Sequence, residues 1–126
     1  MVFTDILNEL VNNVPGAVGA MVMSYDGIPL EQYQKPAATN GSSEPLLDLQ
    51  AVGVEYSTVI NDIKKNAKNF GAEEIHEVTV RSNNRTVMIR LVNEEYFVLL
   101  VLDAEAFFGK GRYLLRHAAL QVRNQL

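Results

Sequence analysis

The chain has 126 residues, of which 48% are hydrophobic and 21% charged, so its size and composition are those of one globular domain over residues 1–126. Its net charge of −4 argues against a broad nucleic-acid-binding surface, and the absence of cysteine excludes disulfide bonds and thiolate metal sites. Because its longest apolar run, residues 97–102, is too short to span a membrane and its start is acidic rather than basic, we expect a soluble, cytoplasmic protein.

The first part of the chain predicts a helix followed by a hairpin. Apolar residues at helical spacing predict a short helix over residues 4–14. Residues 17–24 and 29–35 predict two strands, joined by a tight turn at Asp26 and Gly27. The first of these strands is apolar on both faces, so we expect it inside a sheet.

A loop and a long helix are predicted next. Residues 36–44 have the composition of a loop, and Ser43 is a candidate cap for the element that follows. Residues 45–70 carry apolar side chains every three or four positions, which predicts a long helix. Gly71 is well placed to end it.

The last part of the chain predicts a three-stranded meander and a final helix. The strands are predicted over residues 73–82, 85–92 and 96–103. The last strand contains no polar residue from Tyr96 to Leu102, so both of its faces must be covered. The final helix is predicted from about Gly109 or Arg112 to the end of the chain.

These elements predict an α+β fold, a three-layer α/β/α sandwich around a five-stranded antiparallel sheet. The two most apolar strands should meet in the middle, which gives the strand order 2-1-5-4-3. Strand 2 is an edge strand that charged residues and Pro36 protect. Strand 3 is the other edge and contains no proline over residues 75–81, so it is open to pairing with a second chain in a symmetric dimer.

The long helix carries a second apolar stripe beside its main one. This stripe contains Leu47, Ala51, Val54 and Thr58. Either it is buried within the monomer or it is covered by a partner. An acidic line of Asp48, Glu55 and Asp62 runs beside it, and this line is either a docking surface for a basic partner or a solvated helix face.

Two motifs in this pattern resemble signatures of the Roadblock/dynein light chain family. The opening signature, a glycine-containing first strand ending in an Asp-Gly turn, is matched by Pro15, Gly16, Gly19, Ser24, Asp26 and Gly27. The closing signature, a glycine- and arginine-containing entry to the last helix, is matched by residues 109–116. The order of elements is also similar, and the resemblance covers residues 3–122. The absence of long extensions is closer to the bacterial, MglB-type members.

This resemblance implies properties that the residues alone do not show. Family members form homodimers or heterodimers whose sheets join through strand 3, with the two long helices side by side. They bind small Ras-like GTPases, and some bacterial members raise GTP hydrolysis. Others serve as scaffolds or as dynein-associated adaptors. The open third strand and the second stripe on the long helix agree with dimer formation.

No residue pattern in the sequence predicts catalysis, a cofactor or a metal site. His76 and His117 have no acidic residue three or four positions later, so neither begins a helical metal-binding pair. The glycines of residues 109–112 lack the spacing and the hydroxyl of a phosphate-binding loop. Arg112 and Arg116 lie one helical turn apart. They are candidates for an acidic partner surface, for an arginine finger, or for ion pairs within a solvated helix face.

We therefore predict a non-enzymatic module that forms a homodimer, or a heterodimer with a related domain, and binds a small Ras-like GTPase. It needs no cofactor and binds neither nucleic acid nor membrane. Its regulation of the GTPase is indirect, through positioning of the GTPase's own catalytic groups. The predicted partner or dimer surface contains Leu47, Asp48, Ala51, Val54, Glu55 and Thr58, and the dimer strand contains His76, Val78 and Val80. A scaffold without effect on hydrolysis and a ligand-sensing domain with a core cavity are the alternatives.

Overall fold

Helices and strands follow one another in the predicted order. The computed structural model describes residues 2–36 and 47–126. Within these ranges the elements are α1 (Phe3–Asn13), β1 (Ala17–Ser24), β2 (Pro29–Gln34), α2 (Leu49–Asn69), β3 (Glu77–Arg81), β4 (Arg85–Leu91), β5 (Tyr96–Asp103) and α3 (Phe108–Gln125).

The strands form one antiparallel sheet in the order β2-β1-β5-β4-β3, which confirms the predicted topology. The two most apolar strands pair in the middle, where Met21 of β1 lies opposite Leu99 of β5. β3 pairs with β4 through a register that places Thr79 opposite Met88. The hairpin between β1 and β2 turns at Gly27, whose φ of 85° lies in the left-handed region that glycine tolerates.

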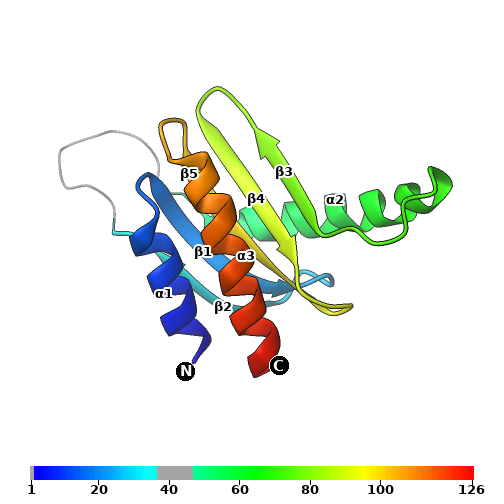
Figure 1. Cartoon of the computed structure of the whole chain (residues 1–126), viewed down its shortest axis with the longest axis horizontal. Coiled ribbons are helices and arrows are strands. Elements are labelled where there is room, and N and C mark those ends of the chain that lie inside the picture. The colour runs from blue at the N-terminus through cyan, green and yellow to red at the C-terminus, as the bar shows by residue number, and fades with distance from the viewer. Residues whose placement is uncertain (1, 37–46) are drawn as a thin grey trace.

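The helices cover both faces of the sheet, as a three-layer sandwich requires. α1 and α3 lie side by side on one face, and α2 crosses the other face (Figure 1). Successive side chains of a strand point to opposite faces, so β5 contributes to two cores. Leu100 packs beneath α1 and α3, whereas Leu99 packs beneath α2.

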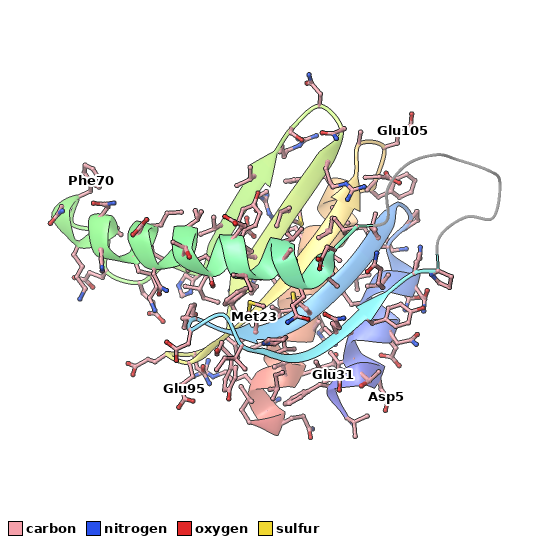
Figure 2. All side chains as sticks on the ribbon, turned by 180° about the vertical axis from the view of Figure 1, so that it is seen from behind. Asp5, Met23, Glu31, Phe70, Glu95 and Glu105 are labelled. Atoms are coloured by element: carbon pink, nitrogen blue, oxygen red, sulfur yellow. The ribbon has the colours of Figure 1, made fainter. Side chains whose placement is uncertain are left out.

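Two elements begin later than predicted, for different reasons. α2 begins at Leu49 because the Asp48 side chain caps it, accepting a hydrogen bond of 3.1 Å from the Ala51 amide. β3 begins at Glu77 rather than at residue 73 because α2 extends past the sheet and residues 72–76 carry the chain back (Figure 2). The predicted cap Ser43, the predicted loop beyond Pro36 and the predicted helix start at residues 45–46 lie outside the described residues.

Candidate interaction surfaces

β3 is an edge strand with one bare side. It pairs with β4, and no other strand in the described part of the chain lies along its outer edge (Figure 1). The unpaired N–H and C=O groups of such an edge form a template for another strand. The predicted open edge is therefore present, and the side chains around it decide what it can bind.

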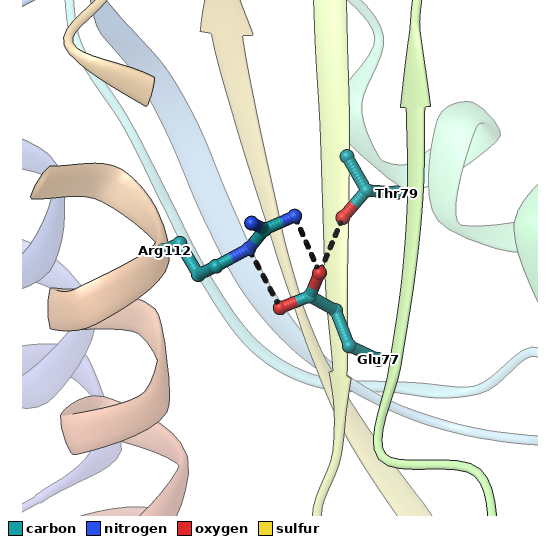
Figure 3. Close-up of polar contacts among 3 residues, drawn as sticks. All are labelled: Glu77, Thr79 and Arg112. Carbon is teal, nitrogen blue, oxygen red and sulfur yellow. Dashed lines mark hydrogen bonds and ion pairs between the residues drawn. The ribbon is translucent and has the colours of Figure 1, made fainter. Parts of the chain in front are cut away.

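The charged side chains of β3 are held on the α3 side of the sheet. Arg112 of α3 approaches Glu77 with Nη2 at 2.9 Å from Oε2, and its Nε donates to Oε1 at 3.1 Å (Figure 3). The Thr79 hydroxyl donates to the same carboxylate at 3.1 Å. Arg81 lies over the Phe108 ring at 4.5 Å, and Arg112 lies over this ring at 4.7 Å. Neither charge of β3 is therefore turned toward the α2 side.

The α2 side of β3 is apolar. Val78 and Val80 alternate with the charged residues and share this side of the strand. Val78 packs against the core beneath α2, whereas Val80 remains 42% exposed. A bare strand edge beside an exposed valine is unprotected against association.

α2 carries an apolar flank on the same side of the sheet as Val78 and Val80, since Val52 and Val78 pack against the same core. Val52, Val59 and Ile63 share one flank of α2 by helical spacing, and Val59 is 41% exposed. Val59 also fits the three-to-four-residue apolar spacing of the predicted helix, but the structure leaves it exposed. We call these three residues, with Val78 and Val80, the β3-side surface.

The opposite flank of α2 is tied to the turn between β1 and β2. The Asn61 amide donates to the Tyr25 carbonyl at 3.0 Å, and the Lys64 ammonium lies 4.1 Å from the centre of the Tyr25 ring. The Tyr25 hydroxyl donates to the Asn93 carbonyl at 3.0 Å. Burial raises the pKa of Tyr25 from 10.0 to about 12. These contacts fix the position of α2 across the sheet.

The residues predicted from the second stripe lie mainly on the face of α2 that points away from the sheet. Ala51, Val54, Glu55 and Thr58 are exposed, with Val54 at 44%. They are not buried within the described monomer, which excludes that interpretation for these four. Two residues differ from the other predicted members, because half-buried Leu47 packs against the core and Asp48 acts as the helix cap. We call the set Leu47, Asp48, Ala51, Val54, Glu55 and Thr58 the outer α2 surface.

The structure corrects the placement of His76. This residue was predicted on the dimer strand, but it precedes β3 and its side chain is exposed. Its carbonyl still accepts a hydrogen bond of 3.0 Å from the Leu91 amide, so it lies beside β4 without being part of the strand. The strand itself is shorter because the chain is still returning from α2 at this point.

Arg112 and Arg116 lie inside α3, and Arg112 is engaged by Glu77. This supports the interpretation of Arg112 as part of an intramolecular ion pair. In the residues that the structure describes, no group of three potential metal-ligating side chains lies together. No helix in the same ranges is both long and apolar enough to cross a membrane.

A hollow of about 1040 Å³ lies at the surface rather than in the core. It is bordered by α3, by the end of β4, by the last turns of α2 and by the segment that joins α2 to β3. The core beneath both helical layers is filled by apolar side chains. A ligand-sensing domain needs a core cavity, so this hollow does not support that alternative.

Comparisons with known proteins agree with this architecture. The family model for the Roadblock/LC7 domain matches residues 3–103, so α3 and the predicted closing signature lie beyond the match. A comparison with curated proteins finds no match. MglC from Myxococcus xanthus is 36% identical, with complete coverage of both chains and a TM-score of 0.70.

Two further solved structures share the fold at lower identity. The gliding protein MglB from Thermus thermophilus is 18% identical, with 97% of this chain and 86% of that chain covered and a TM-score of 0.82. A Roadblock/LC7 domain from Streptomyces avermitilis is 16% identical, with coverages of 95% and 93% and a TM-score of 0.79. Since the family model spans most of the sequence, the chain belongs to the Roadblock/LC7 domain family.

Proposed function

We propose that this chain forms a dimer through the β3-side surface and that the dimer binds and regulates a small Ras-like GTPase. The observation that carries the proposal is the bare edge of β3 with exposed Val59 and Val80 beside it. A second copy of the chain offers the same edge and the same valines, so an isologous contact extends the sheet and buries both. A heterodimer with a related domain uses the same surface.

The outer α2 surface remains for the GTPase. Val54 lies five residues before Val59 and so about 140° from it around the helix, which lets one helix serve two contacts, with Glu55 at the border between them. Val54 supplies apolar area and Glu55 supplies charge, a combination suited to a specific protein surface. In a two-fold dimer the two outer α2 surfaces form one platform.

The similarity to MglC and to the gliding protein MglB supports a regulatory role in gliding motility. The regulation we propose is indirect. Arg112 is held in an ion pair and Arg116 lies within α3, so neither rides on an exposed loop as an arginine finger does. The dimer instead holds the switch regions of the GTPase and positions its own catalytic groups.

Two substitutions on opposite sides of α2 test this assignment. Val59 and Val54 have nearly equal exposure, 41% and 44%, so replacement of either by Asp places the same charge in a similar setting. We expect Val59→Asp to give a monomer and Val54→Asp to leave a dimer that no longer binds the GTPase. Sedimentation equilibrium measures the first property. Titration with each GTP-loaded small Ras-like GTPase of the source organism measures the second.

The proposal is wrong if neither substitution changes association or GTPase binding. A monomeric wild-type chain at high concentration also overturns it. Loss of both properties in Val54→Asp alone assigns the dimer contact to the outer α2 surface instead.

A scaffold without effect on hydrolysis is the second candidate. The engagement of Arg112 by Glu77 favours it, because the described geometry leaves this arginine no free role in phosphoryl transfer. Single-turnover GTP hydrolysis separates the two. A regulator changes the rate and loses this effect in Val54→Asp, whereas a scaffold binds the GTPase and leaves the rate unchanged.

A further inference from the structure

The hollow between the end of α2 and the C-terminal half of α3 has the chemistry of a docking groove. The segment after α2 returns toward the start of β3 (Figure 1), and it lines the hollow together with the end of β4, the last turns of α2 and the C-terminal half of α3. The resulting groove has a volume of about 1040 Å³. We call it the α3 groove. None of the residues of the β3-side or outer α2 surfaces lines it.

Apolar residues line part of the α3 groove. Val92 and Ala119 are buried there, and Leu91 is half-buried. Leu120 belongs to the same lining and is 57% exposed on α3. A large apolar side chain that sits on Leu120 would remove this leucine from water.

Cations dominate the charged lining of the groove. Five basic side chains line it, against three carboxylates: Lys64, Lys68, Arg90, Arg116 and Arg123, against Glu73, Glu74 and Glu94. Between described residues, the ion pair that forms is Arg112 with Glu77, and neither of these lines the groove. The groove cations therefore have no carboxylate within ion-pair distance in the described part of the chain.

The positive charge along α3 also favours an acidic ligand. Every charged residue after Glu105 is positive, and Arg116 and Arg123 lie two helical turns apart with Leu120 between them. One exposed cation therefore lies on each side of an exposed leucine along the helix. The complementary ligand carries two negative charges with an apolar group between them.

We propose that the α3 groove docks an acidic segment of a partner protein, with a large apolar side chain of that segment seated on Leu120. The three carboxylates in the lining disfavour a nucleic acid, whose backbone carries closely and evenly spaced negative charges. A polypeptide can space its acidic residues to meet Arg116 and Arg123 and avoid the carboxylates. A small anion would pair with the basic side chains but would leave the Leu120 side chain exposed to water.

An array of short synthetic peptides tests the proposal. Each peptide carries Glu and Asp with one or two Leu at varied spacing, beside counterparts with Gln in place of the acidic residues and counterparts without Leu. We expect the wild-type chain to prefer the acidic, leucine-containing peptides and to bind the best of them saturably in fluorescence anisotropy. Added salt should weaken this binding, because Arg116 and Arg123 are exposed.

Substitutions of equal charge locate the site. Arg116→Glu with Arg123→Glu should weaken binding by roughly tenfold or more, whereas Lys35→Glu with Lys110→Glu should leave it unchanged. Lys35 and Lys110 do not line the groove, so this control makes the same change in net charge elsewhere. Arg116→Lys with Arg123→Lys should retain most of the binding, and Leu120→Ser should remove the preference for leucine.

Several results would overturn the proposal. They are the absence of saturable peptide binding, equal binding of the Gln counterparts, and equal loss in the two charge-reversed variants. Displacement of the peptide by single-stranded DNA at equal charge would show a site for polyanions in general. Circular dichroism and sedimentation of each variant confirm that fold and association are retained, which separates failure here from failure of the proposed dimer.

Discussion

Arg112 of α3 clamps Glu77 of β3 by two contacts, at 2.9 Å and 3.1 Å, across 35 positions of the sequence (Figure 3). The pair joins the last helix to the edge strand whose outer side is bare. Because the carboxylate also accepts from Thr79 within the strand, the clamp fixes the side chains of β3 on the α3 side. The α2 side of the strand is thereby left apolar.

We expect Glu77→Gln to reduce the free energy of unfolding by about 0.5–1 kcal/mol, since a two-point pair that is partly exposed is worth little more. Urea denaturation measures this loss. Glu105→Gln, which removes an exposed carboxylate from the loop before α3, is the matched control and should be neutral. In a variant that already carries Arg112→Gln, the Glu77→Gln substitution should not reduce the free energy of unfolding any further. An equal loss in both backgrounds would show that the pair does not contribute.

Gly16 is a position where the backbone requires glycine. Its φ is 89°, and a Cβ atom there would lie 2.6 Å from the Cα of Ala106, which belongs to the backbone and cannot move aside easily. Gly16→Ala should therefore cost about 2–4 kcal/mol of unfolding free energy. Gly109→Ala is the control, because a Cβ there meets no described atom within 4 Å and alanine favours the helix. Similar stability of the two variants in thermal melts would contradict this prediction.

Tyr25 makes stability depend on pH in the alkaline range. Burial raises its pKa from 10.0 to about 12, so the folded chain retains a proton that the unfolded chain loses. The stabilisation is complete below pH 10, the unfolded pKa, and is lost as the pH rises toward 12. By about pH 11 the loss should be about 1 kcal/mol, after allowance for water at the partly buried hydroxyl.

Tyr25→Phe isolates this effect. At neutral pH the variant loses the hydrogen bond to the Asn93 carbonyl, which costs about 1 kcal/mol. Because phenylalanine does not ionise, the difference between the variant and the wild-type chain should shrink between about pH 9 and about pH 11. Urea titrations at these pH values measure the difference in free energy of unfolding between the variant and the wild-type chain. A constant difference would show that Tyr25 titrates normally.

The sequence pattern was sufficient for the sheet but not for the distribution of residues around α2. The apolar strands β1 and β5 require a central position, and this fixed the strand order. On α2, however, small and polar residues face the sheet: Gly53 allows close approach to Met21, and Ser57 is buried near Gly27. Val59 is consequently turned outward, which hydrophobic periodicity alone does not reveal.

Contacts between distant segments were equally beyond the sequence pattern. Nothing in the spacing of Glu77 and Arg112 indicates that they meet, and the interpretation of the arginines therefore remained open. The α3 groove is assembled from α2, β4 and α3, so its lining residues form no motif in the sequence. The prediction that β3 was an open edge succeeded because it required only composition and strand order.

The two edges of the sheet offer a direct comparison of protected and unprotected strands. Val80 on β3 and Leu30 on β2 are both 42% exposed, so lysine at either position adds one charge in a similar environment. If the dimer forms through β3, Val80→Lys places a like charge on each side of the two-fold contact and removes an apolar group from it. We expect self-association to weaken by roughly tenfold or more, which corresponds to about 1.4 kcal/mol or more.

Leu30→Lys should leave self-association unchanged, because β2 is already followed by Pro36 and carries Glu31. Sedimentation equilibrium of both variants at matched concentration measures the difference, and loss of association in Leu30→Lys alone would place the contact on β2.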